Sequence, residues 1–322
     1  QVKIIVALLI VFISGSILLI YMGVNFEDKD NANIVRKKFE KKLVNRYTSF
    51  ETIGKNLNLS YPQDMVISNN DIYVVDSRNN RVLKIDDKGN LIKQLGGEGT
   101  GNGEFKNPIG ITVDNNNDIY VADSGNNRVE VFDNSGKYIR EVKVDDLSDK
   151  YNESISHIEV DNIGNIFLSI FSKDGSGKDV MVIKSNGRTN RIVNKMIGVL
   201  GKLDNRIFFA TEYEVVKEKK SLSLQSGISN IIELTTGKIL NKTDLPYSYT
   251  AKSITSYDGY LYLFSGSYKT IDKFDSNGSY IESVYQADIN NDGLGFMTMD
   301  KSGNIYIVDY INNVIYKVSK NK

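Results

Sequence analysis

A short stretch of this chain is repeated at a fixed spacing. The dipeptides Ile72-Tyr73, Ile119-Tyr120 and Ile166-Phe167 follow one another at intervals of 47 residues. Around the first two, the similarity extends over DIYVVDSRNNRVLKIDDKGNLI and DIYVADSGNNRVEVFDNSGKYI, and NIYIVDYINNVIYKVS near the end of the chain is a third close copy. A period of this length indicates stacked copies of one supersecondary unit, which constrains the fold more than any single residue does.

Each copy has the pattern of four short strands. In the second, GITVD, IYVADS, RVEVFD and KYIREVKV are rich in β-branched and aromatic residues, and Asn, Asp and Gly separate them. Such runs with turn residues between them are typical of antiparallel hairpins. Four antiparallel strands in one unit predict a blade of a β-propeller.

An aliphatic–aromatic dipeptide marks the second strand of each blade, and counting it gives the number of blades. The copies are Ile72-Tyr73, Ile119-Tyr120, Ile166-Phe167, Ile207-Phe208, Leu261-Tyr262 and Ile305-Tyr306. The sequence therefore predicts an all-β, six-bladed β-propeller over residues 48–322. Blade four carries an insertion near 214–228, which predicts a long hairpin between its second and third strands.

The last blade has only three strands before the chain ends. Upstream of blade one, SFETIG at 49–54 has no partner of its own and resembles the outer strand LIKQLG at 91–96. We expect SFETIG to be the missing outer strand. Pairing the two ends of the domain would close the ring and leave no radial edge open.

The second blade and the loop before it resemble the NHL-repeat family of six-bladed β-propellers. The match covers GGEGTGNGEFKNPIGITVDNNNDIYVADSGNNRVEVFD at 96–133, including Phe105, Pro108 and Gly110. Blades one and six match without the Gly-rich loop, and the other blades match in strand pattern. The resemblance implies the fold over about 49–320 and selects no single activity.

An uncharged stretch of 19 residues, 4–22, precedes the repeats. As a helix it would be roughly 28 Å long, close to the hydrocarbon thickness of a bilayer. We expect residues 1–25 to be an uncleaved transmembrane signal anchor, and a cleaved signal peptide is the alternative. Val35, Phe39 and Leu43 then predict a helical stalk over 26–47, and a basic helix lying on lipid headgroups is the alternative.

The charges around this stretch bear on its orientation. Glu27, Asp28 and Asp30 follow it closely and favour a propeller outside the cytoplasm, whereas the basic residues between 36 and 42 favour the opposite side. We expect a single-pass membrane protein with an extracytoplasmic propeller.

Forty basic and forty acidic residues cancel, so no nucleic acid is expected as a partner.

Two side chains invite a catalytic interpretation. The only histidine, His157, lies in the inner strand of blade three, and Glu159 shares its face of that strand. One histidine without cysteine cannot build the zinc site that the resemblance implies for lyases of the NHL type. We interpret His157 as a packing or channel-lining residue, with a role as general base as the alternative.

A calcium loop is suggested by DINNDG at 288–293. Asp288, Asn290 and Asp292 offer oxygen ligands at alternate positions before a glycine, but Met299 occupies the twelfth position, where a bidentate Glu is expected. An Asn/Asp-rich turn explains the segment equally simply. No cofactor is therefore expected, and calcium is the open alternative.

Basic residues gather in the sequence of blades three and four. They predict either a solvated face or a surface for an anionic partner, and the candidates are Lys184, Arg188, Arg191, Lys195, Lys202 and Arg206.

The pairs Asp76–Arg81 and Asp123–Arg128 bracket the same turn in two blades. A pair copied between blades predicts a structural role.

No complete catalytic set is recognisable. We therefore expect a membrane-anchored, extracytoplasmic propeller that acts as a non-enzymatic module binding a protein or a cell-surface ligand. The alternative is a lactonase- or lyase-like enzyme with a divalent metal at the mouth of the propeller channel.

Overall fold

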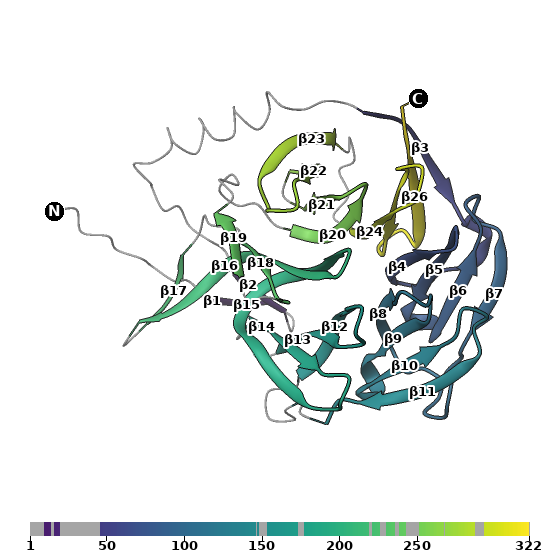
Figure 1. The fold of residues 1–322 in the computed structure, drawn as a ribbon, viewed down its shortest axis with the longest axis horizontal. Helices are drawn as coiled ribbons and strands as arrows, with labels where there is room; N and C mark the ends of the chain where they lie inside the picture. Colours follow the sequence, from purple (N-terminus) through teal and green to yellow (C-terminus); the bar gives the residue numbers. More distant parts are fainter. Residues whose placement is uncertain are drawn as a thin grey trace.

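The computed structural model describes residues 10–13, 16–19 and 46–321, apart from 146, 148–152, 173–176, 219–220, 226–229, 236–237, 243–250, 267 and 287–292. The described residues within 46–321 form a six-bladed β-propeller whose blades surround a central axis (Figure 1). The predicted all-β, six-bladed propeller is thus confirmed.

Three blades are regular four-stranded antiparallel sheets made from consecutive strands. Blade one consists of β4 (Pro62–Ser68), β5 (Asp71–Asp76), β6 (Arg81–Ile85) and β7 (Leu91–Leu95). Blade two consists of β8 (Pro108–Val113), β9 (Ile119–Asp123), β10 (Arg128–Phe132) and β11 (Tyr138–Lys143). Blade five consists of β20 (Ala251–Tyr257), β21 (Tyr260–Ser265), β22 (Thr270–Phe274) and β23 (Tyr280–Gln286).

Blades three and four share one long strand, which the sequence did not predict. Blade three contains β12 (Glu153–Val160), β13 (Ile166–Ser172) and β14 (Gly177–Ile183), and its outer strand is the first half of β15 (Thr189–Leu203). The second half of β15 is the inner strand of blade four and pairs with β16 (Arg206–Glu218). The remaining strands of blade four are β18 (Asn230–Glu233) and β19 (Lys238–Lys242).

The insertion in blade four forms the predicted hairpin. The end of β16 pairs with β17 (Ser221–Gln225), from Glu214 opposite Gln225 to Glu218 opposite Ser221. This hairpin extends beyond the four-stranded part of the blade (Figure 1).

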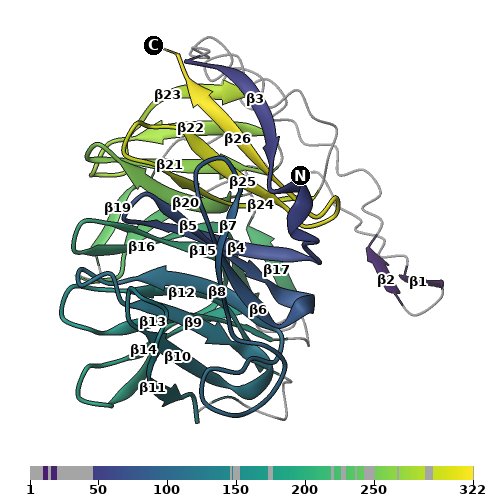
Figure 2. The same ribbon diagram turned by 90° about the vertical axis from the view of Figure 1, so that its right-hand side faces the viewer.

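The ring is closed by strands from the two ends of the domain, as predicted. Blade six contains β24 (Leu294–Met299), β25 (Ile305–Asp309) and β26 (Val314–Lys320), and its outer strand is β3 (Tyr47–Ile53). Figure 2 shows β3 lying along β26. The strand begins at Tyr47, which pairs with Lys320, so it takes one residue from the stalk expected over 26–47.

The hydrophobic core lies between neighbouring blades. Tyr73 and Val82 of blade one, for example, pack with Ile111 and Ile119 of blade two in one buried cluster. The aliphatic–aromatic dipeptides supply much of this core, because the second strand of each blade is covered on both faces. This explains why these positions carry the repeat.

The Asp–Arg pairs have the predicted structural role. Asp76 Oδ2 accepts a hydrogen bond of 2.7 Å from Arg81 Nε, and Asp123 Oδ2 accepts one of 2.9 Å from Arg128 Nε. Each aspartate also accepts from the backbone of the preceding inter-blade loop, at Ser60 and Lys106. The Gly-rich stretch 96–103 is such a loop.

The N-terminal stretch differs from its prediction where it is described. β1 (Ile10–Ile13) and β2 (Ser16–Leu19) form a two-stranded antiparallel sheet in place of part of the predicted helix. Their Ile, Val and Phe residues favour strands at least as strongly as helices. Among the residues that the structure describes, no helix combines the length and the apolarity needed to cross a membrane. The rest of residues 4–22 and the predicted stalk residues 26–45 lie outside the described residues.

Candidate functional site: the central pocket

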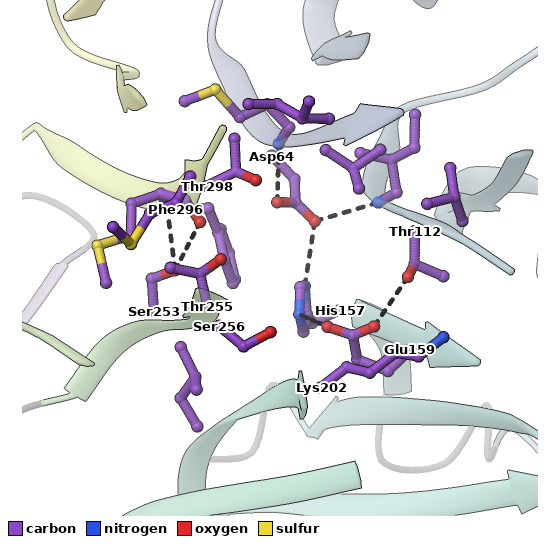
Figure 3. A pocket seen from close by; sticks show the side chains of 18 of the residues that line it. Asp64, Thr112, His157, Glu159, Lys202, Ser253, Thr255, Ser256, Phe296 and Thr298 are labelled. Carbon is purple, nitrogen blue, oxygen red and sulfur yellow. Dashed lines mark hydrogen bonds and ion pairs between the residues drawn. The ribbon is translucent and has the colours of Figure 1, made fainter. Parts of the chain in front are cut away.

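The inner strands of all six blades line a pocket on the propeller axis. Its volume is about 340 Å³, and it is bordered by β4, β8, β12, β15, β20 and β24 (Figure 3). Asp114, Asn115 and Asp204, which follow their inner strands, also border the pocket. It therefore lies toward the C-terminal ends of these strands.

The blade repeat identifies equivalent positions on the inner strands, most of which line the pocket, but their residue types differ from blade to blade. One layer lies three residues before the inner-strand residue that pairs with the aliphatic residue of each dipeptide. It contains Asp64, Gly110, His157, Val199, Ser253 and Phe296. A second layer, two residues further along, contains Val66, Thr112, Glu159, Gly201, Thr255 and Thr298.

His157 is held between blades one and six. Its side chain is 7% exposed, and its ring stacks on Phe296 with centroids 4.4 Å apart. Nδ1 lies 3.1 Å from Asp64 Oδ2, yet the angles are poor, and this buried nitrogen has no hydrogen-bond partner among the described residues. The contact is thus an electrostatic one that favours a proton on Nδ1.

The carboxyl group of Asp64 is held in place by backbone amides. Its two oxygens accept hydrogen bonds from the backbone N–H groups of Met65, at 2.8 Å, and Ile111, at 3.1 Å. The second of these bonds joins blade one to blade two. Since backbone amides engage both oxygens, Asp64 is fixed in the wall of the pocket, beside the imidazole of His157.

Whereas Asp64 lies on the Nδ1 side of His157, Glu159 lines the pocket on the Nε2 side. Its Oε2 accepts a hydrogen bond of 2.8 Å from the Thr112 hydroxyl, and its Oε1 lies 4.0 Å from His157 Nε2. Burial raises the pKa of Glu159, while the charges of His157 and Lys202 and the Thr112 hydrogen bond act in the opposite direction. Lys202 also lines the pocket, without an ion pair to Glu159 within 4.0 Å.

Blades five and six contribute neutral hydroxyl groups to the other half of the pocket. Ser253 accepts a hydrogen bond from the backbone N–H of Met297, at 3.0 Å. Within the part of the chain that is described, the hydroxyls of Thr255, Ser256 and Thr298 have no hydrogen bond to protein. One half of the pocket is therefore ionisable and the other is polar but uncharged (Figure 3).

Some of the predicted site residues line the pocket, and others lie outside the described residues. His157 and Glu159 do share one face of β12, and both line the channel, as expected. The calcium candidates Asp288, Asn290 and Asp292 lie outside the described residues. Across the described ranges, no group of three or more His, Asp, Glu or Cys side chains has a geometry that could hold a metal ion.

The five basic candidates whose side chains the structure describes occupy separate places in the fold. Lys184 and Arg188 are exposed at the outer turn between β14 and β15, whereas Lys202 lines the central pocket. Arg191 pairs with Asp179 at 2.6 Å. Arg206 donates to the backbone oxygen of Ser276 at 2.9 Å, and Lys195 lies in β15 with a side chain outside the description.

Fold and pocket together define this protein as a six-bladed β-propeller with a polar pocket on its axis. A family model described as a 6-bladed beta-propeller matches residues 24–312, so the chain belongs to this family, DUF5128. No curated protein matches the chain in sequence.

Several solved structures are similar in fold. Virginiamycin B lyase from Staphylococcus aureus matches 84% of this chain and 99% of its own, with a TM-score of 0.55 and 12% identity. A gluconolactonase from Xanthomonas campestris matches 85% of this chain and 94% of its own (TM-score 0.57, 13% identity). Regucalcin from Agrobacterium tumefaciens, a calcium-binding protein, matches 86% and 96% (TM-score 0.57, 7% identity). At these identities the likeness shows the fold alone.

Proposed function

We propose that this protein is a single-pass membrane protein with NHL-type blades, whose propeller lies outside the cytoplasm and binds a small polar ligand, or a polar group of a partner protein, in the central pocket. The observation that carries the proposal is the pocket itself. It offers three unbonded hydroxyls and the accessible side of the His157–Glu159 pair, in a concave site of a size suited to a small molecule. We propose neither a bound cofactor nor nucleic acid as a partner.

Binding in the pocket is tested with a panel of small cationic, neutral and anionic molecules, scored by the rise in melting temperature. We expect stabilising molecules that lose their effect in Thr255→Trp and in Ser256→Phe, because either ring fills the polar half of the pocket. Lys252→Trp, an exposed position on the same strand, is the matched control and should leave the effect intact. Stabilisation that survives both pocket-filling changes contradicts the proposal.

The alternative is an enzyme in which His157 acts as general base. The contact between Asp64 and the His157 ring supports it, since it orients the ring with Nε2 toward the pocket. The fold is also shared with proteins named as a lyase and a gluconolactonase. Mass spectrometry of each stabilising molecule after incubation separates the two functions. A product that forms with the native chain and is lost in His157→Gln would establish the enzyme.

The location of the propeller is tested on intact cells with an externally added protease. We expect the propeller to be digested or clipped without permeabilisation, while a cytoplasmic marker protein stays whole. Protection of the propeller until the membrane is opened would place it on the cytoplasmic side and remove extracellular ligands from consideration.

A further inference from the structure

We infer that the ligand of the central pocket presents a primary ammonium group, whose nitrogen binds between His157 and Glu159. This inference rests on the proposed binding function and deepens it by naming the chemistry that the pocket recognises. It starts from two acceptor atoms that face each other across a short gap and have no hydrogen-bond partner among the described residues.

The gap has the right width for one nitrogen. His157 Nε2 and Glu159 Oε1 are 4.0 Å apart, too far for a hydrogen bond with each other. A nitrogen placed about 2.9 Å from each atom would reach both, because twice that hydrogen-bond length exceeds the gap. Asp64 beside Nδ1 favours the tautomer in which Nε2 carries a lone pair. Both atoms are then acceptors.

The number of donors separates an ammonium from a hydroxyl group. A hydroxyl carries one proton and can satisfy only one of the two acceptors, whereas an ammonium carries three. Its third N–H remains available for a hydroxyl oxygen, and Thr255, Ser256 and Thr298 line the same pocket.

The charge of the site favours the same ligand. Asp64 and Glu159 are both largely buried, with side chains 3% and 13% exposed, and Lys202 forms no close ion pair with either. A buried carboxylate is costly unless a positive charge lies beside it. A ligand ammonium would supply that charge to Glu159, and an anionic ligand would add to the repulsion.

The test uses three linear four-carbon probes that differ only in their end groups: 1,4-diaminobutane, 1,4-butanediol and succinate. Binding to the full chain is measured by isothermal titration at about pH 8, where free imidazole is neutral. We expect the diamine alone to bind, and Glu159→Gln to weaken it at least about tenfold, since the amide keeps the shape and removes the charge. Glu51→Gln, on the exposed face of β3, is the matched control and should change nothing.

Two further measurements sharpen the result. Lys202→Gln should tighten diamine binding, because it removes a like charge from the pocket. Binding should also weaken as the pH falls, because burial raises the pKa of Glu159 and a proton there removes both the charge and an acceptor; Asp64, His157 and Lys202 are the other ionisable groups that face it.

The inference is overturned if the diamine does not bind, or if it binds Glu159→Gln as tightly as the native chain. It is also overturned if calcium chloride binds at this pair in place of the diamine. Should butanediol or succinate bind in a manner blocked by Thr255→Trp, the binding function stands and the ammonium inference fails. If no molecule of any charge is sensitive to the pocket-filling changes, the proposed function itself fails.

Discussion

Deleting residues 48–56 is expected to lower the melting temperature of the propeller by about 10–20 °C. The deletion removes nearly all of β3, which pairs with β26 from Ile315 opposite Ile53 to Lys320 opposite Tyr47. Ile53, which the deletion removes, is 5% exposed, and burial of such a side chain contributes about 1.5–3 kcal/mol. Loss of the ladder would also leave the edge of β26 open.

The matched control is a deletion of residues 1–45, which keeps β3. In that chain Arg46 retains its ion pair with Glu282, at 3.0 Å, and its backbone oxygen still accepts from Asn321. We expect it to melt like the full chain when circular dichroism follows the strands. Equal melting temperatures for the two deletions would show that the ring does not depend on this strand.

Closure could be foreseen because it follows from counting. Three strands remain in the last blade, and one unassigned strand-like segment, SFETIG, stands before the first. The six dipeptides likewise specify six blades, since each lies on a strand that is buried on both faces. Such features depend on local sequence and on the number of repeats, and both are visible without coordinates.

The merging of blades three and four could not be foreseen in the same way. A blade boundary is recognised by its turn residues, and the fifteen residues of β15 contain no cluster of them between Thr189 and Leu203. The strand pairs with β14 from Thr189 to Met196 and with β16 from Met196 onward, so it changes blade without interruption. Only the pairing in three dimensions shows where one blade ends.

The sequence predicted two of the three interacting residues of the candidate site, His157 and Glu159 but not Asp64. Alternation along one strand places His157 and Glu159 on the same face, and the structure confirms this. Asp64 was missed because it lies 93 residues before His157 and meets it only when the ring closes. The available indication was its register, since both residues occupy the same layer of their inner strands. The repeat identifies such a layer, but it does not reveal which members lie close enough to interact.

A second expected result concerns a carboxylate buried in blade two. Glu130 lies on β10 with no solvent exposure, at the position that Leu83 occupies in blade one. Its Oε1 accepts from the backbone N–H of Gly103 and lies 3.1 Å from Arg128 Nη2. Its Oε2 is buried without a hydrogen-bond partner in the described part of the chain.

Burial raises the pKa of Glu130 from 4.5 to about 7, against the opposing effects of the Gly103 hydrogen bond and the Arg128 charge. The charges of Asp123 and Glu141 raise it further. The folded state therefore holds this proton more tightly than the unfolded state does. The contribution of this proton to stability is fully present below pH 4.5, decreases as the pH rises to about 7, and is lost above that.

The expected loss is at most about 3.5 kcal/mol, because the pKa rises from 4.5 to about 7 and each pKa unit corresponds to about 1.4 kcal/mol. Glu130→Gln keeps the shape of the side chain and cannot titrate. The free energy of unfolding is measured with urea at about pH 4.5 and about pH 8. Between these pH values we expect Glu130→Gln to lose less free energy of unfolding than the native chain, and the difference should nearly equal the expected loss given above.

The comparison is a double difference, so any change in stability that Glu130→Gln causes at both pH values cancels. Glu130→Leu, which installs the residue of blade one, should flatten the pH dependence equally. Glu51→Gln, exposed on β3, should leave it as in the native chain. If the native chain and Glu130→Gln lose the same free energy of unfolding over this range, Glu130 is already ionised at low pH. Its Arg128 contact would then outweigh the cost of burial.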